Sequence, residues 1–271
     1  MSTALITGAS RGLGRLVSLS LASEGIDLIL VGRNKPRLLK VASEAKDLNQ
    51  DIRIAPVQID LSDGTAVGLI KLAAHGFGGV DIVVNNAAVQ GPIGEAWKVS
   101  AREFEETIRM NFLVPSEICR AFVPHMIAKG AGWIVNLSGG GATSPRPMFS
   151  AYAAAKTALV RFGETLAAEC SGLGVRVNSV APGAFRSGMT SAVLSAGAVA
   201  GQTEISVANR LLTDDSGAAE KAAELITYLV AGEGRDISGK LISAIWDDWK
   251  SIPSSLNDLQ NSDRFTLRRI N

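Results

Sequence analysis

Short apolar segments of strand length alternate with segments of helical periodicity over most of this chain, and this alternation restricts the possible folds more than any other feature. Strands that alternate with helices form a parallel sheet whose two faces the helices cover. A chain of 271 residues can bury the core that such a sheet needs. The segments that we expect to be strands are residues 3–7, 26–31, 52–59, 80–84, 133–137, 175–180 and 240–245.

The first of these strands ends in a glycine-rich turn, Gly8-Ala9-Ser10-Arg11-Gly12-Leu13-Gly14, which leads into a helical pattern. Glycine has no Cβ atom, so a pyrophosphate group can approach the backbone amides and the positive end of the following helix. The spacing G-x-x-x-G-x-G differs from the commoner dinucleotide fingerprint G-x-G-x-x-G. A plain structural turn is the alternative interpretation, but the position at the first strand–helix junction favours dinucleotide binding.

Tyr152 and Lys156 lie four residues apart in an alanine-rich segment. On a helix, this spacing places a phenol and an ammonium on the same face. A free phenol titrates near pH ~10, so proton donation near neutral pH needs a cation close by in a partly dry cleft. We therefore expect an acidic tyrosine, although the two residues alone would also fit a surface pair.

Composition is that of one globular domain and excludes several classes of protein. The residues are 46% hydrophobic, and a formal net charge of +1 argues against a nucleic-acid or membrane-surface partner. Two cysteines exclude a disulfide framework, and two histidines predict no metal site. We find no leader pattern before the first strand and no apolar segment of membrane-spanning length, so we expect a cytoplasmic protein.

An ordered series of motifs resembles the classical short-chain dehydrogenase/reductase family over residues 3 to about 245. The resemblance implies an α/β fold with one Rossmann-type, doubly wound, seven-stranded parallel sheet of order 3-2-1-4-5-6-7 and helices on both faces. It also implies a nicotinamide-dependent oxidoreductase that forms a homodimer or homotetramer. The motifs are Thr7-Gly8-x-x-x-Gly12-x-Gly14, Asp60-Leu61, Asn85-Asn86-Ala87-Ala88, Asn111, Ser138, Tyr152-x-x-x-Lys156 and Asn178-x-x-x-Pro182-Gly183.

The same resemblance implies four catalytic residues. Tyr152 would protonate a carbonyl oxygen as hydride arrives, or accept the proton in the reverse direction. Lys156 would lower the pKa of Tyr152 and hold the nicotinamide ribose, and Ser138 would hydrogen-bond the substrate oxygen. Asn111, in a predicted helical stretch over residues 101–129, would help to hold a water that connects the lysine to solvent. A polar residue that satisfies a helix irregularity is the alternative for Asn111.

The end of the second predicted strand indicates which cofactor binds. An acidic residue there would bond the ribose 2′-hydroxyl of NAD, but this chain has Arg33, and Arg11 lies in the glycine turn. A guanidinium offers a planar, charged fork to the 2′-phosphate of NADP(H), so we expect that cofactor; two solvated loop arginines are the alternative. The expected cofactor contacts are Gly8, Ser10, Arg11, Gly12, Leu13, Gly14, Arg33, Asp60, Leu61, Asn86, Ala87, Tyr152, Lys156, Pro182 and Gly183.

Two positions depart from the family pattern. Ala88 replaces the usual glycine, a mild change of backbone freedom. Ser138 lies fourteen residues before Tyr152, whereas the commonest spacing is thirteen, and that position is Gly139. A one-residue shift in an extended segment turns a side chain to the opposite face. We favour an extra residue in the run Gly139-Gly140-Gly141, with Ser138 facing the substrate; the alternative is that the site has no serine.

These features predict an NADP-dependent oxidoreductase that interconverts a ketone and a secondary alcohol, with the small-molecule substrate left open. A catalytically weak NADP-binding sensor is the alternative, which the doubtful serine favours and the Tyr–Lys pair opposes. A sugar epimerase or dehydratase fits less well, because such proteins have longer chains and another glycine spacing. We expect residues 1–250 to form one dinucleotide-binding and catalytic domain, and residues 251–271 to pack on the body or on a neighbouring subunit.

Overall fold

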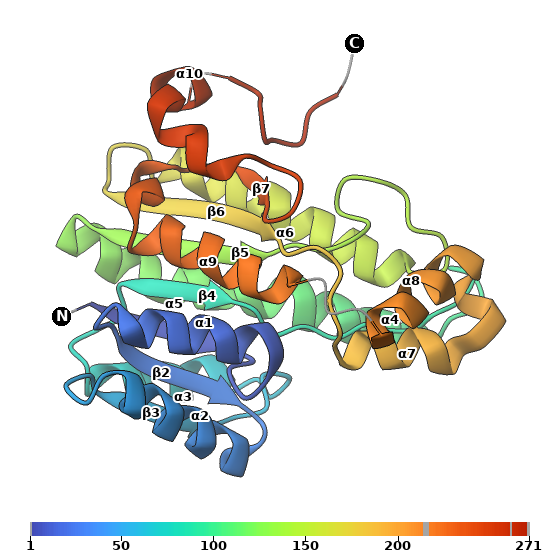
Figure 1. Cartoon of the computed structure of the whole chain (residues 1–271), viewed down its shortest axis with the longest axis horizontal. Coiled ribbons are helices and arrows are strands. Elements are labelled where there is room, and N and C mark those ends of the chain that lie inside the picture. Colours follow the sequence, from blue (N-terminus) through green and yellow to red (C-terminus); the bar gives the residue numbers. More distant parts are fainter. Residues whose placement is uncertain (1, 214–216, 261, 270–271) are drawn as a thin grey trace.

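One seven-stranded parallel sheet of order β3-β2-β1-β4-β5-β6-β7 organises the molecule (Figure 1), which confirms the predicted fold class and strand order. The structure is a computed structural model that describes residues 2–213, 217–260 and 262–269. Each strand lies within one of the apolar segments or one residue beyond it. The strands are β1 (Thr3–Thr7), β2 (Asp27–Gly32), β3 (Ile54–Gln58), β4 (Ile82–Asn85), β5 (Gly132–Leu137), β6 (Val175–Ala181) and β7 (Leu241–Ser243).

Helices connect successive strands, as a parallel sheet requires. Within the described residues, no helix is both long and apolar enough to cross a membrane. The α-helices are α1 (Gly12–Ser23), α2 (Lys35–Leu48), α3 (Ala66–His75), α4 (Ala101–Ile108), α5 (Val114–Lys129), α6 (Ser150–Glu169), α7 (Gly188–Ala196), α8 (Gln202–Thr213), α9 (Ala218–Val230) and α10 (Leu256–Gln260). The shorter 3-10 and π segments are η1 (Arg109–Leu113), η2 (Gly197–Ala200), η3 (Glu233–Asp236) and η4 (Trp249–Ser255).

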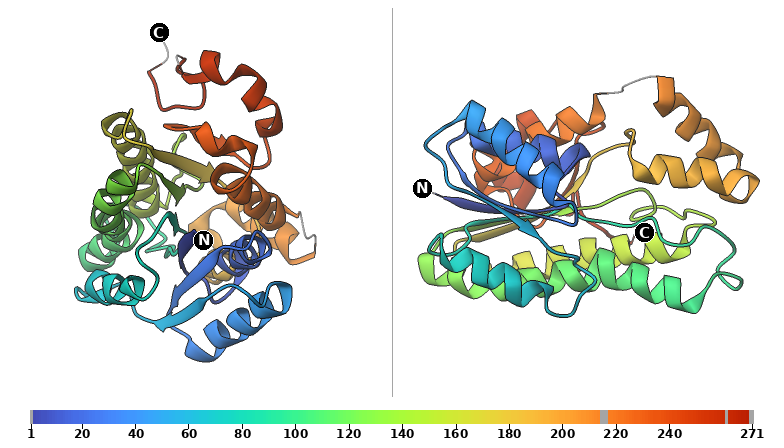
Figure 2. Two further views of the ribbon diagram at one scale, coloured as in Figure 1. Left: turned by 90° about the vertical axis from the view of Figure 1, so that its left-hand side faces the viewer. Right: turned by 90° about the horizontal axis from the view of Figure 1, so that it is seen from below.

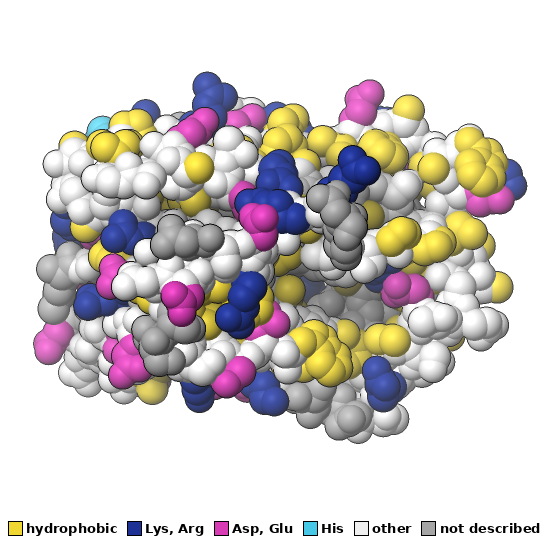
Figure 3. All heavy atoms as spheres, turned by 90° about the horizontal axis from the view of Figure 1, so that it is seen from above, with side chains coloured by type: hydrophobic (Ala, Val, Ile, Leu, Met, Phe, Trp, Pro, Cys, Tyr) yellow, Lys and Arg dark blue, Asp and Glu magenta, His cyan; other side chains and the backbone are white. Residues whose placement is uncertain are grey.

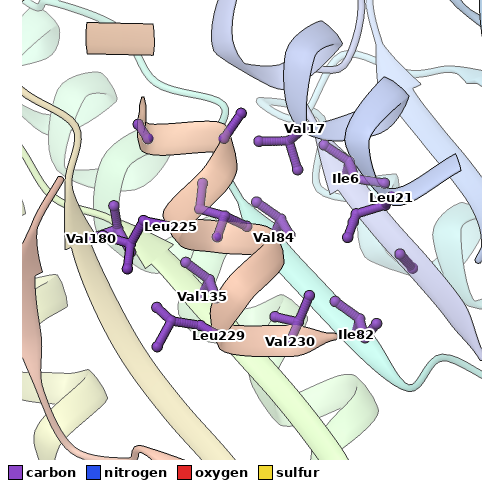
Figure 4. Packing of buried hydrophobic residues seen from close by; sticks show 14 of the residues in the cluster. Ile6, Val17, Leu21, Ile82, Val84, Val135, Val180, Leu225, Leu229 and Val230 are labelled. Carbon is purple, nitrogen blue, oxygen red and sulfur yellow. The ribbon is translucent and has the colours of Figure 1, made fainter. Parts of the chain in front are cut away.

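The helices cover both faces of the sheet (Figure 2). One layer contains α1, α2 and α9, and the other contains α3, α5 and α6. Because successive strand residues point to opposite faces, Ile6 of β1 packs into the first layer and Leu5 into the second. Figure 4 shows the first layer, where Leu225 of α9 lies beside Val180 of β6. Burial on both faces explains why the strands are almost continuously apolar.

The segment with α7 and α8 extends past the carboxyl ends of the strands, beyond the sheet (Figure 2, right). The loop between β5 and α6, residues 138–149, lies at the same end (Figure 1). In parallel α/β sheets this end carries the binding crevice. Seen from above, Figure 3 shows positive and negative side chains intermixed, without a large field of one sign.

The C-terminal segment lies along the edge of the sheet that β7 forms. Trp249 is buried in the core beside α9, with its ring centroid 5.0 Å from that of Tyr228. The Leu241 N–H donates to the Phe265 carbonyl at 2.7 Å, and the Ser243 N–H donates to the Asp247 carboxylate at 2.6 Å. Both N–H groups that β7 turns away from β6 are therefore hydrogen-bonded.

Candidate active site

The glycine turn between β1 and α1 packs tightly against the loop that follows β4. Gly8 has φ +67°, and a Cβ atom at Gly14 would overlap the Gly8 carbonyl oxygen and lie 2.6 Å from Asn86 Nδ2. Asn86 fastens the turn, because its Nδ2 donates to the Thr7 carbonyl at 2.8 Å. No side chain among the described residues caps the N-terminus of α1, so its first amides are available to an anion. The cradle fits a pyrophosphate.

The residue directly after β2 is positively charged, and no carboxylate lies at this position. Arg33 is exposed there, and its charge adds to the two hydrogen bonds from Ser62 that hold the pKa of Asp60 below its usual range. Arg11 extends from the glycine turn toward α7, where a Cβ atom at Gly188 would lie 3.2 Å from its Nη2. The structure thus leaves the Arg33 side chain exposed beside the expected adenosine end, while Arg11 faces the segment beyond the strands.

Asn111 lies in the π segment η1, between α4 and α5, and is fully buried. Its Oδ1 accepts from the Val89 N–H at 2.9 Å, and its Nδ2 donates to the Val89 carbonyl at 2.9 Å. The predicted helical stretch over residues 101–129 is therefore interrupted by one π turn, a feature found often at functional sites. Both hydrogen bonds of the Asn111 side chain go to the loop after β4 and fix it there, and neither goes to the helix.

Tyr152 and Lys156 lie in the first turns of α6, with 6% and 2% of their surface exposed. Lys156 Nζ donates to the Leu137 carbonyl at 2.6 Å and lies 5.8 Å from the centroid of the Tyr152 ring. Burial lowers the pKa of Lys156 to about 8, because the ammonium has lost water without gaining a carboxylate.

The pKa of Tyr152 does not behave as the sequence led us to expect. Burial raises it, and the cation that opposes this rise is Arg146, in the loop before α6, and not Lys156. The reason is geometric: the lysine ammonium is directed at the end of β5, where the Leu137 carbonyl holds it. Lys156 is thus not among the charges that lower the pKa of Tyr152 in this arrangement, and its effect on the acidity of the tyrosine stays a prediction.

The residue beside the tyrosine hydroxyl is Gly139. A Cβ atom there would overlap Tyr152 Oη, so no larger residue fits in this arrangement. Ser138 continues β5, with its N–H donating to the Val180 carbonyl at 2.8 Å, and its hydroxyl is buried without a partner among the described residues. Because neighbouring side chains of an extended segment point to opposite faces, this geometry favours the registration without a serine, against our preference for Ser138.

The loop after β6 is held at both ends. Gly183 has φ +80°, and a Cβ atom there would lie 2.6 Å from Ile245 Cγ1, after β7. Ser187 and Thr190 form a capping box that starts α7. Pro182 and Gly183 thus lie where β6 passes into the α7–α8 segment.

Sequence reasoning missed the residues that close over the tyrosine. Phe149, Val193 and Ala208 form a small buried cluster with Tyr152, partly covered by side chains from the loops and from α7 and α8. Arg146 binds Glu204 of α8 through two hydrogen bonds of 2.7 Å. No sequence signal marks this pair, because its members are 58 residues apart in two segments without a motif.

A cleft opens beside this cluster and shares Ile93 and Met148 with it. Glu95, Lys98 and Glu103 also line the cleft. Hydrophobic side chains are frequent at this end of the molecule in Figure 3, at the right of the view. Among the described residues, no three His, Cys, Asp or Glu side chains form a group that could hold a metal ion.

Known proteins with similar sequences and structures were compared with the chain. The family model described as short chain dehydrogenase matches residues 2–197. A short chain dehydrogenase of Pseudocercospora fijiensis is 33% identical over 195 residues, which cover 68% of this chain and 60% of that protein. The match thus spans less than two thirds of the length of this relative.

Two solved structures share the fold and bind different cofactors. Carveol dehydrogenase from Mycobacterium avium, in complex with NAD, has a TM-score of 0.76 at 25% identity, covering 89% of this chain and 95% of that one. A metagenomic short-chain oxidoreductase in complex with NADP has a TM-score of 0.71 at 25% identity, with the same shares covered. Likeness to such structures alone does not distinguish NAD from NADP.

Proposed function

The chain belongs to the short-chain dehydrogenase/reductase family, and from this premise we propose that it is an NADP(H)-dependent oxidoreductase that interconverts a ketone and a secondary alcohol. The observation that carries the proposal is the Tyr152 side chain, 6% exposed, whose hydroxyl lies against Gly139 at the carboxyl end of the sheet, with Lys156 one helical turn further along α6. An acid and a cation in a water-poor cleft are what proton transfer to a carbonyl oxygen requires.

The cofactor would lie across the carboxyl ends of the strands. Its pyrophosphate fits the cradle of Gly8, Gly12 and Gly14, where a Cβ atom at two of the three positions would meet neighbouring atoms. Arg33 supplies charge for a 2′-phosphate, and no carboxylate at the end of β2 opposes it, whereas Arg11 is directed at α7. When bound, the nicotinamide ring supplies or takes up the hydride.

In this proposal the side chains of the site divide the work of proton transfer and positioning. Tyr152 Oη gives its proton to the carbonyl oxygen during reduction and takes it back during oxidation. Lys156 holds the ribose hydroxyls and, with a pKa of about 8, can exchange a proton at Nζ near neutral pH. Asn111 keeps the loop after β4 in place through Val89. The cluster around Phe149 excludes water from the phenol, which favours a substrate with apolar groups next to its carbonyl.

The first test replaces the proton donor. Tyr152→Phe should remove nearly all turnover and leave the affinity for NADPH within a few fold of wild type, because only the transferable proton is deleted. Turnover would be measured on a panel of ketones and secondary alcohols, and affinity by titration. A Tyr152→Phe protein with more than a tenth of wild-type turnover would contradict the mechanism.

The second test concerns the phosphate. Wild-type protein should bind NADPH at least about tenfold more tightly than NADH, or ~1.4 kcal/mol, and Arg33→Ala should weaken NADPH alone. Arg102→Ala, an exposed arginine on α4, serves as the control for loss of one positive charge. Equal losses for both cofactors would mean that Arg33 supports the fold, and a wild-type preference for NADH would refute the assignment.

Gly139 favours a second candidate, an NADP-binding sensor with little or no turnover. A hydroxyl at this position would be the second donor to the substrate oxygen, and the chain lacks it there. Tight NADPH binding without turnover of any carbonyl compound in the panel would support the sensor. In either case we propose a homodimer or homotetramer, on the strength of the family alone.

A further inference from the structure

Arg146 brings a second cation to the tyrosine. The carbon of its guanidinium lies 4.0 Å from the centroid of the Phe149 ring and 5.6 Å from that of Tyr152. Nε and Nη2 each donate to a different oxygen of Glu204 at 2.7 Å, a bidentate pair with 18% of the arginine and 27% of the glutamate side chain exposed. An ion pair this protected from water acts strongly on its surroundings.

The glycine run after β5 contacts both the phenol and the arginine. A Cβ atom at Gly139 would overlap Tyr152 Oη, and one at Gly140 would lie 3.8 to 4.0 Å from Arg146 Cδ, Nε and Cζ. The two side chains therefore rest against adjacent residues of one backbone segment. A Cβ atom at Gly140 would only touch the arginine, whereas one at Gly139 would displace the phenol.

We propose that Arg146 is a positioning residue that makes Tyr152 more acidic, and that Glu204 limits how much of the arginine charge the phenol experiences. The inference deepens the proposed function and rests on Tyr152 as its proton donor. Because Glu204 belongs to α8 and Arg146 to the loop before α6, the pair also connects the segment beyond the strands to the acid.

The charged groups around the phenol are few. On its own helix, Lys156 directs its ammonium at the Leu137 carbonyl. The residues directly after β5, Ser138 and Gly139, are uncharged, as are Val193 of α7 and Ala208 of α8. Among the described residues that pack around Tyr152, Arg146 and Lys156 are thus the cations near the ring, at 5.6 and 5.8 Å from its centroid, and only Arg146 has a carboxylate partner. Burial raises the pKa of Tyr152 and the Arg146 charge lowers it, in agreement with this arrangement.

The proposal predicts shifts of opposite sign. Arg146→Gln removes the cation and leaves Glu204 unneutralised, so the phenolate is disfavoured and the pKa of Tyr152 rises. Glu204→Gln leaves the cation without its counter-charge, so the pKa falls. Each shift should be about one pH unit, given two charges ~6 Å apart in a partly dry site. Arg146→Lys keeps the charge and should stay close to wild type.

The chain allows a direct measurement. It has two tyrosines, so a Tyr228→Phe background leaves Tyr152 as the single phenol, and its ionisation can be followed by ultraviolet difference absorption in the protein without cofactor or substrate. Glu44→Gln, which breaks the Arg15–Glu44 pair between α1 and α2, is the matched control and should cause no shift. Melting curves establish that each variant is folded.

Opposite shifts in Arg146→Gln and Glu204→Gln, with Arg146→Lys unmoved, would support the proposal. Shifts of the same sign, or none, would overturn it, since a purely structural pair would change stability and not acidity. If Arg146→Gln fails to fold, the proposal is still tested by the other two variants: the pKa of Tyr152 should fall in Glu204→Gln and stay unchanged in Arg146→Lys. The titration needs no turnover, so absent catalysis would refute the proposed function while leaving this result intact.

Discussion

Lys156 carries a charge that its surroundings disfavour. The side chain is 2% exposed, and its ammonium has a backbone carbonyl as partner in place of a carboxylate. The pKa falls from its usual 10.5 to about 8. The protein therefore keeps a residue that costs stability at neutral pH, as binding and catalytic sites commonly do.

This cost predicts how stability depends on pH. Below pH 8 Lys156 is charged in the folded and the unfolded chain, so the burial penalty is complete. Between pH 8 and 10.5 the folded protein releases the proton first, so the free energy of unfolding rises with pH; above 10.5 both states are neutral. Relative to Lys156→Met, wild type should gain melting temperature between pH 8 and 10. Parallel melting curves for the two proteins would contradict the lowered pKa.

Ser138 is tested by deletion of its hydroxyl. Since Gly139 lies beside Tyr152 Oη, Ser138→Ala should change turnover less than threefold. If the serine instead bonds the substrate oxygen, turnover should fall by roughly a hundredfold, or ~2.7 kcal/mol. Steady-state rates at saturating substrate distinguish the two, and the larger loss would restore our first assignment of Ser138.

At the scale of elements, the sequence predicts strands better than the interruption of a helix. The strands are bounded apolar segments, and those inside the sheet are buried on both faces, so composition alone locates them. In the π turn, Asn111 is hydrogen-bonded to Val89, 22 residues earlier in the chain, and no local pattern contains that contact. β7 is shorter than predicted, because the chain after Ser243 turns so that Asp247 accepts from the Ser243 N–H.

The residues of the candidate site likewise include some that the sequence predicts and some that it does not. Motif residues such as Gly8, Asn86 and Tyr152 were predictable because their spacing along the chain fixes their place at the end of a strand or helix. Arg146 and Glu204 were not, because only the packing of α8 against the loop before α6 brings them together. The direction of the pKa change in Tyr152 was also missed, since it depends first on the burial of the phenol.

At the scale of the whole molecule, the C-terminal segment contributes to one core. Ile252 and Leu259 are buried with the layer of α1, α2 and α9, and the Leu267 N–H donates to Glu164 of α6 at 2.7 Å. Lys240 Nζ donates to two carbonyls of the same segment, one of them that of Ser262 at 2.8 Å. The segment is thus held by the sheet, by α6 and by the core.

Deletion of residues 251–271 should therefore lower the melting temperature by on the order of 10 °C, from the loss of two buried aliphatic side chains. Calorimetry of the truncated and full chains measures this. A chain shortened only by residues 270–271 keeps every contact named above and is the control. An unchanged melting temperature after the longer deletion would show that these contacts contribute nothing to stability.

The hydrogen-bonded edge of β7 also bears on aggregation. An open sheet edge can template the addition of strands from other copies of the chain. At β7 the outward N–H groups of Leu241 and Ser243 are already used. At the opposite edge, Pro56 of β3 has no N–H to offer, and its carbonyl accepts from Lys35 Nζ at 2.6 Å. Both edges of the sheet thus have features that oppose the addition of another strand. Fibril-like growth from the β7 side would first require the C-terminal segment to detach.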